Sequence, residues 1–288
     1  MLRSLIESMR PAQWAKNLIL FAGIIFAQKF LDPDLLLKAI LGFVIFCLLS
    51  GAGYIINDVV DRKQDAIHPR KRERPIASGR FSPAEATLIA ISLMVVSLAA
   101  SFWTSPLFGF AALGYLSLNL GYSFSFKNIV IVDVMALALG FVLRAVAGAL
   151  IVAVEISPWL LLCTILLALF LGLSKRRHEL ILLEDDALNH RRILQEYSPS
   201  LLDEMISVVT SSTVMAYTLY TFFSKTATKT HYLMLTVPFV LYGIFRYLYL
   251  IHQKNEGGSP EVLLLTDKPL LIDILLWLIA VFLILYVT

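Results

Sequence analysis

Residues 36–65 read LLKAILGFVIFCLLSGAGYIINDVVDRKQD, and this stretch decides the class of fold. Its first part, residues 36–56, contains one charged side chain, Lys38. An apolar run of about 20 residues is long enough to cross a bilayer as an α-helix. Polar residues then follow the apolar run without a break. We therefore expect a membrane-spanning helix that ends in a cluster of carboxylates.

The composition of the whole chain supports a membrane protein. Of its 288 residues, 58% are hydrophobic and 16% are charged, and the mean hydropathy is +0.78. Soluble domains are usually about 45–50% apolar and about 25% charged. This excludes an ordinary cytosolic protein and a disordered chain, and the net charge of +3 is too small to suggest a nucleic-acid partner. Cys47 and Cys163 both lie in apolar runs, which favours core positions over a disulfide or a metal site.

Nine apolar runs can serve as membrane spans, and none shows the alternation of a β-barrel strand. They are residues 17–31, 36–56, 84–102, 107–125, 129–153, 157–174, 206–223, 233–251 and 269–287. The sequence therefore predicts an all-α, polytopic membrane protein with about nine transmembrane helices. We expect them to form a single domain over residues 1–288.

Lysine and arginine are concentrated in the loops of one face. If the N-terminus is cytoplasmic, the cytoplasmic segments carry eighteen of them, and the opposite loops carry only Lys225 and Lys229. Such a bias indicates which face is cytoplasmic. The two long polar segments, 57–83 and 175–205, then lie on the cytoplasmic side, where we expect the active site. The leucine spacing within 175–205 also predicts an amphipathic helix at the membrane interface.

The acidic cluster at the end of the second span has helical spacing. Asn57, Asp61 and Asp65 repeat every four residues and share one helix face, which Asp58 adjoins. Carboxylates this close repel one another, and a divalent cation relieves the repulsion. Oxygen ligands without His or Cys suit Mg²⁺. The sequence predicts a Mg²⁺ site at these four residues, with Asp58 and Asp61 as catalytic residues. The alternative is a solvated helix end neutralised by the two basic residues after Asp61.

A basic run, residues 68–80, follows the acidic cluster directly. Its Arg72 and Arg74 can make forked contacts with phosphate oxygens. The run also helps to keep this loop on the cytoplasmic side, where it can contact anionic lipid. Carboxylates for Mg²⁺ beside arginines form the composition expected of a diphosphate site.

Further polar residues stand at other helix ends of the same face, and we expect them to bind or orient substrate. They are Lys16, Asn17, Tyr122, Lys127, Lys175 and Glu179. For Lys16 and Asn17, the alternative is that they only flank the first span and help to anchor it in the membrane.

Asp133, Arg144 and Arg246 lie inside predicted spans, where ionisable groups are costly and usually face a cavity or a partner. Asp133 and Arg144 are about three turns apart on one helix face. Pairing with other helices is one interpretation of both. We interpret Arg246 as structural or as reaching toward the membrane interface.

These residues resemble the UbiA superfamily of intramembrane prenyltransferases. The motif Asn57-Asp58-x-x-Asp61-x-x-x-Asp65 is similar to the first aspartate-rich motif of that superfamily, and so is the segment 72–79. The resemblance covers nearly the whole chain. It implies a UbiA-like bundle of nine helices in the plasma membrane, with an active site at the cytoplasmic side and Mg²⁺ as cofactor.

One branch of the superfamily, the decaprenyl-phosphate phosphoribosyltransferases, is similar in four segments. They are residues 10–17, 68–75, 141–148 and 175–180. This branch implies transfer of 5-phosphoribose from 5-phosphoribosyl 1-diphosphate to a polyprenyl phosphate, as a precursor of cell-wall arabinan. The usual second aspartate-rich motif is replaced here by Lys175–Leu180 and then Glu184-Asp185-Asp186, which favours this branch.

Two other functions stay open at this point. A prenyltransferase that attaches an isoprenoid to an aromatic or other acceptor would use the same fold and the same first motif. A transporter or lipid-binding protein would show internal repeats and polar groups near the bilayer midplane. No clear repeat is visible in the sequence. The expected partners are the two substrates and membrane lipid, and homo-oligomerisation stays open.

Overall fold

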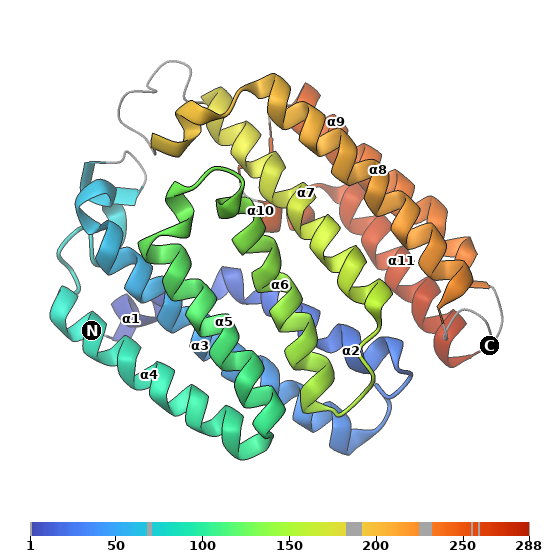
Figure 1. Cartoon of the computed structure of the whole chain (residues 1–288), viewed down its shortest axis with the longest axis horizontal. Helices are drawn as coiled ribbons and strands as arrows, with labels where there is room; N and C mark the ends of the chain where they lie inside the picture. The colour runs from blue at the N-terminus through green and yellow to red at the C-terminus, as the bar shows by residue number, and fades with distance from the viewer. Residues whose placement is uncertain are drawn as a thin grey trace. The chain divides into compact units, whose positions relative to one another are not determined.

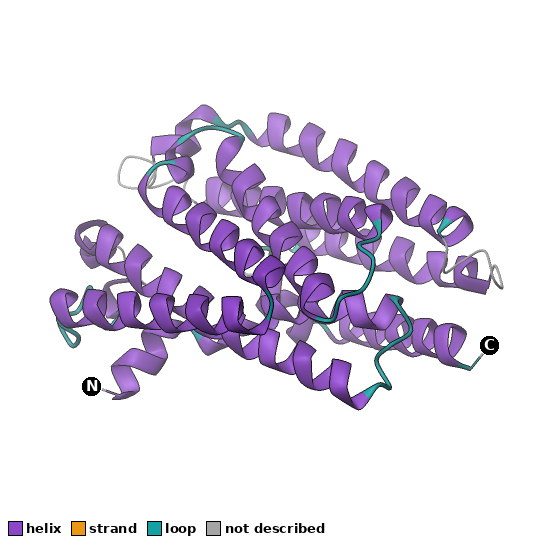
Figure 2. Cartoon of the chain, turned by 60° about the horizontal axis from the view of Figure 1, so that its bottom comes forward, coloured by secondary structure: helices purple, strands orange, loops and turns teal. Residues whose placement is uncertain are grey.

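In the computed structural model, the chain is described at residues 2–67, 71–182, 192–224, 232–254, 256–258 and 260–287. Most of these residues are helical, and they include no strand (Figure 1). The view in Figure 2, coloured by secondary structure, also shows helices joined by loops in the described chain. The expectation of an all-α fold is confirmed.

Eight helices of the described residues are long and apolar enough to cross a membrane. They are α3 (Pro33–Ile67), α4 (Pro83–Thr104), α5 (Pro106–Phe124), α6 (Val132–Ile151), α7 (Pro158–Leu182), α8 (Pro199–Phe223), α9 (Val237–Gln253) taken together with the preceding η7 (Tyr232–Thr236), and α11 (Lys268–Tyr286). Shorter elements connect or precede them. They are α1 (Leu2–Met9), η1 (Pro11–Leu20), α2 (Phe21–Phe26), η2 (Lys71–Glu73), η3 (Phe126–Asn128), η5 (Arg192–Glu196), η7 (Tyr232–Thr236) and α10 (Pro260–Thr266). The chain is a multi-pass membrane protein.

The first expected span, residues 17–31, differs from the others. It falls on the end of the 3₁₀ helix η1 and on the six-residue α2. Gln28 adopts a left-handed φ of 57°, and the N–H of Lys29 bonds the carbonyl of Ile24, which ends α2 in a Schellman motif. The remaining eight expected spans coincide with long helices. The count of nine stays a prediction.

The expected interfacial helix within 175–205 cannot be followed along its length. Residues 175–182 continue α7 as a helix, and residues 192–196 form η5. The intervening leucines of the pattern lie outside the described residues.

Helix α3 is much longer than a bilayer is thick. The Asp32 carboxylate accepts hydrogen bonds from the N–H groups of Asp34 and Leu35 at 3.1 and 3.2 Å, which caps the helix start. At about 1.5 Å per residue, α3 is roughly 52 Å long, whereas the hydrocarbon core is about 30 Å thick. Its last turns therefore extend beyond the apolar run and carry the acidic cluster, as expected.

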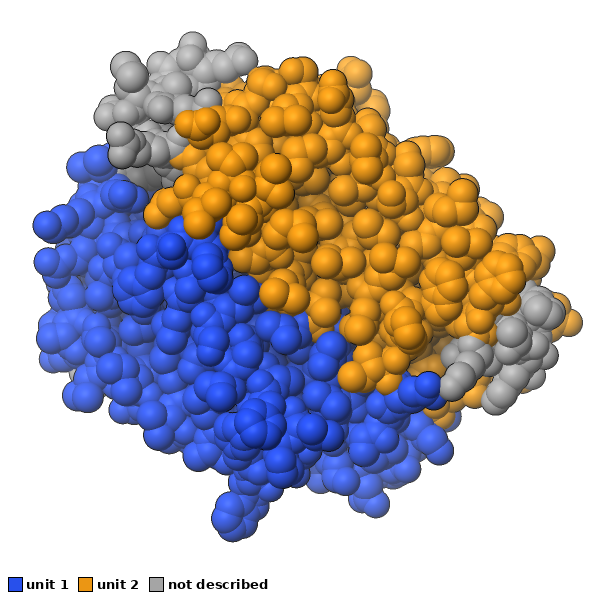
Figure 3. Space-filling model, in the orientation of Figure 1, with its two compact units in different colours: residues 1–24, 29–127, 143–155 blue, residues 25–28, 128–142, 156–288 orange. Residues whose placement is uncertain are grey.

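The described chain divides into two compact units (Figure 3). Unit 1 consists of residues 1–24, 29–127 and 143–155, and unit 2 of residues 25–28, 128–142 and 156–288. Helix α6 contributes its first half to unit 2 and its second half to unit 1. The single domain over 1–288 stays a prediction.

In unit 1, α3 packs against α4 and α5, and both α1 and η1 pack against α3. Phe46 of α3 meets Phe108 and Tyr115 of α5, with ring centroids 5.8 and 5.1 Å apart. Gly148 of α6 lies against the backbone of η1, because a Cβ at this glycine would be 2.0 Å from the carbonyl oxygen of Leu20. Only glycine permits this close approach.

In unit 2, α7 packs against α8, and α9 packs against α8 and α11. One apolar cluster includes Phe170 and Tyr247, whose rings meet edge to face at 5.1 Å. A second cluster surrounds Tyr217, whose hydroxyl accepts a hydrogen bond from Trp277 Nε1 at 2.8 Å. Each unit thus has its own core.

Candidate active site

The aspartates at the end of α3 are held inside unit 1. Asp58 and Asp65 are 2% and 3% exposed, while Arg62 and Lys63 are exposed. If the carboxylates were neutralised only by the basic residues next to them at a solvated helix end, Asp58 and Asp65 would be exposed to water. Their partners come instead from other segments of unit 1.

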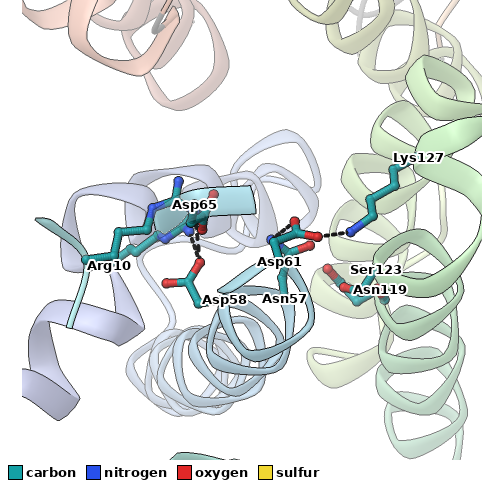
Figure 4. Close-up of polar contacts among 9 residues, drawn as sticks. Arg10, Asn57, Asp58, Asp61, Asp65, Asn119, Ser123 and Lys127 are labelled. Atoms are coloured by element: carbon teal, nitrogen blue, oxygen red, sulfur yellow. Dashed lines mark hydrogen bonds and ion pairs between the residues drawn. The ribbon is translucent and has the colours of Figure 1, made fainter. Parts of the chain in front are cut away.

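The first group of partners consists of two arginines. Arg74 Nη1 donates to Asp58 Oδ1 at 3.1 Å and to Asp65 Oδ2 at 2.5 Å. Arg10 Nη2 donates to the same oxygen of Asp58 (Figure 4). Asp58 and Asp65 are seven residues, or about two helical turns, apart, so one arginine can bridge them. The side chains of Arg10 and Arg74 are each 26% exposed.

Arg74 is placed by a compact loop. Its backbone N–H bonds the carbonyl of Lys71 at 3.0 Å, and its own carbonyl accepts from the N–H of Ser78 at 2.8 Å. Ile76 and Phe81, which are 3% and 2% exposed, anchor the loop in the core of unit 1. The loop backbone therefore holds Arg74 in a defined position.

Arg10 occupies the junction between α1 and η1. Its φ of 52° lies in the left-handed region, which is uncommon for a residue other than glycine. Its guanidinium also lies over the ring of Tyr54, 5.1 Å from the centroid. Arg10 belongs to the segment 10–17 that resembles the phosphoribosyltransferase branch, but it is not among the site residues predicted from the sequence. Its place directly before Pro11 was the available signal, since proline favours the first turn of a helix.

The second group lies around Asp61. Lys127 Nζ donates to Asp61 Oδ1, and Asn57 Nδ2 donates to Asp61 Oδ2 at 3.1 Å. Figure 4 shows Asp61 pointing toward Lys127, whereas Asp58 points toward Arg10. Lys127, on η3, is only 8% exposed. The acidic cluster thus has two groups of partners.

The structure brings together six of the expected site residues. They are Asn57, Asp58, Asp61, Asp65, Arg74 and Lys127. Arg72 lies on η2 with an exposed side chain, and Lys16 on η1 and Tyr122 on α5 are half-buried.

The carboxylate and amide oxygens of the cluster are ligands of the type that Mg²⁺ prefers. Mg²⁺ is usually bound by one or two carboxylates, with substrate phosphates and water completing the coordination. Among the described residues, no three His, Cys, Asp or Glu side chains converge as a ready-made metal cluster. The carboxylates are instead balanced by cations. The assignment of Asn57, Asp58, Asp61 and Asp65 as Mg²⁺ ligands stays a prediction.

Asn17 belongs to a separate, buried network in unit 1. Its Nδ2 donates to Cys47 Sγ at 3.3 Å and Ser50 Oγ at 3.2 Å, and its Oδ1 accepts from Arg144 Nε at 2.7 Å. Arg144 Nη2 also donates to the hydroxyl of Tyr115 at 2.5 Å. These bonds join η1, α3, α5 and α6, so Arg144 pairs with other helices, as one interpretation expected.

Unit 2 contains the remaining expected residues. Lys175 and Glu179 lie on α7, and Glu179 Oε2 accepts from Arg176 Nη1 at 2.5 Å. Arg176 Nε also donates to Asp133 Oδ2 at 2.7 Å. Asp133 therefore pairs with another helix, and sequence reasoning missed Arg176 as its partner.

Arg246 of α9 forms a two-armed ion pair with Asp267, at 3.1 Å and 2.8 Å. Asp267 also caps α11 by accepting from the N–H of Leu270 at 3.0 Å. The hydrogen bond from Arg246 is the main cause that lowers the pKa of Asp267 below its usual value. The structural interpretation of Arg246 agrees with this geometry.

Eight apolar helices, together with a cluster of aspartates paired with two arginines and a lysine, define a membrane protein with a polar site at the end of one helix. The model of the UbiA prenyltransferase family matches residues 17–267, so the chain belongs to this family and is a transferase. The resemblance drawn from the aspartate motif is confirmed. A transporter or lipid-binding protein without chemistry is excluded.

Two relatives are similar over nearly the whole chain. The decaprenyl-phosphate phosphoribosyltransferase of Corynebacterium glutamicum is 31% identical over 98% of this chain and 87% of its own length. The enzyme of the same name from Mycolicibacterium smegmatis is 32% identical over 95% of this chain and 90% of its own length.

A solved structure supports the fold. A UbiA homolog from Archaeoglobus fulgidus, bound to DMAPP and Mg²⁺, superposes with a TM-score of 0.76. It is 21% identical to this chain, and the match covers 99% of this chain and all of that one. At this identity, the likeness shows the UbiA fold.

Proposed function

We propose that the chain transfers 5-phosphoribose from 5-phosphoribosyl 1-diphosphate to a polyprenyl phosphate of the decaprenyl type, and releases diphosphate. The observation that carries this proposal is the cluster at the end of α3, where the buried Asp58 meets Arg10 and Arg74, and Asp61 meets Lys127. Near-full-length similarity to two decaprenyl-phosphate phosphoribosyltransferases supports the choice of substrates.

The cluster has the parts that a diphosphate needs. Asn57, Asp58, Asp61 and Asp65 would hold Mg²⁺, which when bound supplies charge that stabilises the departing diphosphate. Arginine and lysine side chains bind phosphate oxygens, and arginine does so with two parallel donors. In this proposal the phosphate-binding residues are Lys16, Arg72 and Arg74.

The bond changes are those of a substitution at the anomeric carbon. An oxygen of the polyprenyl phosphate bonds to C1 of the ribose, while the bond from C1 to the diphosphate oxygen breaks and its electron pair leaves with diphosphate. The attacking phosphate is already anionic near neutral pH, so no strong base is required. Tyr122, Lys127, Lys175 and Glu179 orient the substrates, and Lys127 also offsets negative charge on the diphosphate.

The location of the site follows from the same proposal. The excess of lysine and arginine on one set of loops supports an active site on the cytoplasmic side of the plasma membrane. A water-soluble sugar diphosphate would enter from that side. The polyprenyl tail would stay in the lipid.

The proposal is tested with purified protein, Mg²⁺, labelled 5-phosphoribosyl 1-diphosphate and a polyprenyl phosphate. We expect label in the lipid phase and release of diphosphate, both lost when EDTA replaces Mg²⁺. Folded protein that transfers no label would overturn the proposal.

Family membership favours a second candidate, an isoprenoid transfer from a prenyl diphosphate to an aromatic or other acceptor. The Archaeoglobus fulgidus homolog, solved with DMAPP, shows that this fold accommodates such a donor. Turnover of prenyl diphosphate, together with inactivity toward the sugar diphosphate, would select this candidate.

A further inference from the structure

Helix η1 of unit 1 is an unusually long 3₁₀ helix. It runs for ten residues, Pro11–Leu20, whereas 3₁₀ runs longer than about four residues are uncommon because their hydrogen-bond geometry is poor. A 3₁₀ segment of this length therefore needs contacts with other segments to keep its conformation. In unit 1, α3 and α6 supply these contacts.

The main anchor of η1 is the side chain of Asn17, which is fully buried. Its Nδ2 donates to Cys47 Sγ and Ser50 Oγ of α3, at 3.3 and 3.2 Å. Its Oδ1 accepts from Arg144 Nε of α6 at 2.7 Å. One amide thus uses both its donor group and its acceptor. An ionised aspartate has no N–H, so it cannot make the two bonds to α3.

Arg144 and Gly148 hold η1 at two points of α6. The two residues are about one turn apart and share a helix face. Arg144 is 6% exposed and also donates to the Tyr115 hydroxyl at 2.5 Å, which fixes its guanidinium against α5. Gly148 lies against the carbonyl of Leu20, one 3₁₀ turn after Asn17. Two contacts one turn apart prevent η1 from sliding along α6 or rotating against it.

The opposite end of η1 carries Arg10. The N–H of Gln13 bonds the carbonyl of Arg10 at 2.8 Å, and Trp14 Nε1 donates to the carbonyl of Met9 at 3.2 Å. These bonds join the first turn of η1 to the end of α1. From this junction the Arg10 guanidinium reaches Asp58, as Figure 4 shows.

The type of helix sets where Arg10 lies relative to Asn17. A 3₁₀ helix rises about 2.0 Å and turns about 120° per residue, compared with about 1.5 Å and about 100° in an α-helix. Over the seven residues between them, rewinding into an α-helix would shift Arg10 by about 3.5 Å and rotate it by roughly 140°. The side chain would then no longer face Asp58. The conformation of η1 therefore decides whether the arginine meets the cluster.

Stability alone is a weak reason for the buried network around Asn17. Its polar side chains must be removed from water, and hydrogen bonds inside the protein largely offset that cost without a large surplus. A network whose hydrogen bonds are made instead selects one arrangement of the segments that it joins. Here that arrangement is the 3₁₀ form of η1.

We propose that Asn17 and Arg144 are positioning residues: they keep η1 in its 3₁₀ form and thereby hold Arg10 at the acidic cluster, where the diphosphate of the donor binds in the proposed function. The inference rests on that proposed function and deepens it. Asn17, which the sequence predicts to bind substrate, acts in this proposal through Arg10 and not by its own contact with substrate.

A double-mutant cycle on the purified chain tests this assignment. The wild type, Asn17→Ala, Arg10→Gln and the double variant are compared in the KM for 5-phosphoribosyl 1-diphosphate, measured by label transfer to polyprenyl phosphate. We expect Arg10→Gln to raise this KM by about tenfold or more, as for a lost hydrogen bond to a charged group. Asn17→Ala should raise it by a smaller factor, about three- to fivefold, because the arginine is present but less well held.

The double variant gives the decisive comparison. In the Arg10→Gln background, Asn17→Ala should change the KM by less than about twofold, because the residue through which Asn17 acts is gone. Effects that multiply in the double variant would show a general structural role and overturn the proposal. An unchanged KM in Arg10→Gln would overturn it as well.

Two further variants separate positioning from a general loss of packing. Arg144→Lys keeps the charge but loses the planar guanidinium that reaches both Asn17 and Tyr115, so it should raise the KM with the same dependence on Arg10. It also serves if Asn17→Ala does not fold. Tyr217→Phe is the matched control, since it removes a buried hydroxyl with two hydrogen bonds in unit 2. It should keep the wild-type KM, and a rise like that of Asn17→Ala would overturn the proposal.

The conformation of η1 is measured directly by hydrogen exchange with mass spectrometry. Backbone amides of residues 12–20 should exchange faster in Asn17→Ala than in the wild type, because the anchor that keeps the 3₁₀ form is lost. Exchange at the wild-type rate would overturn the role of Asn17, whatever the activity.

The outcomes separate this inference from the proposed function. A wild type that transfers no label overturns the proposed function. The same cycle is then measured as calorimetric binding of inorganic diphosphate with Mg²⁺, which both candidate functions require. Coupling between Asn17 and Arg10 in that measurement supports the positioning role alone. Independent effects, or a wild type that binds no diphosphate, overturn that role too.

Discussion

Two of the arginine–carboxylate groups among the described residues differ in how far the arginine is exposed. At the end of α3, Asp58 faces Arg10 and Arg74, each with 26% of its side chain exposed. In unit 2, Asp133 is fully buried and Arg176 is 2% exposed. A partly exposed arginine can exchange a carboxylate for a phosphate, because water solvates both groups during the exchange. A fully buried pair cannot separate without a large desolvation cost. The first pair is suited to binding, the second to holding a structure.

The largest effect is expected at the α3 cluster. Asp58→Asn or Asp61→Asn should abolish transfer, by a factor of about 1,000 or more, because the charge that would hold Mg²⁺ at the diphosphate is lost. The measurement is label transfer to lipid at saturating substrates. Thermal unfolding in detergent serves as the control for folding. Near-wild-type turnover in either variant would remove that residue from the metal site.

A large effect on stability is expected in the buried pair. Asp133→Asn should lower the free energy of unfolding by about 3 kcal/mol, because it leaves the guanidinium of Arg176 short of a charged partner. Thermal or SDS-induced unfolding, followed by helical circular dichroism, measures this. Asp58→Asn should change stability much less. Equal destabilisation by both variants would show that exposure does not distinguish the two groups.

Lys127 tests whether the cluster binds substrate. Lys127→Ala removes the ammonium from Asp61 and should raise the KM for the sugar diphosphate by about tenfold, with a smaller change in kcat. The measurement is the KM of the variant for each of the two substrates. An unchanged KM for both substrates would exclude Lys127 from binding.

The smallest effect is expected at an exposed ion pair of unit 1. Arg80 Nη2 lies 3.1 Å from Glu7 Oε1, with side chains 49% and 43% exposed. Arg80→Ala should change the free energy of unfolding by less than about 1 kcal/mol, because water and salt screen such pairs. The same unfolding assay at low and high salt checks this. If Arg80→Ala lowered the free energy of unfolding as much as Asp133→Asn does, the claim that buried ion pairs matter more than exposed ones would be contradicted.

Much of the site could be predicted from sequence because it depends on local spacing. Asn57, Asp61 and Asp65 share a face once the helix continues, and the helix does continue to Ile67. Arg10 could not be found in this way. It lies 48 residues from Asp58, and the left-handed turn that aims it leaves no periodic signal in the sequence. The Ile131–Tyr197 bond, between residues 66 apart, is of the same kind.

The sequence by itself determined the membrane location, the all-helical fold, the family and the acidic face of α3. The family follows from the resemblance of the aspartate motif, and the other three follow from local composition or from the 3.6-residue period of one helix. Only the tertiary structure decided which cation meets which carboxylate. It also decided that Asn17 faces Arg144 and that Arg176 joins Asp133 to Glu179. Such pairs depend on the packing of segments far apart in the chain, and side-chain charge alone does not select among many candidate partners.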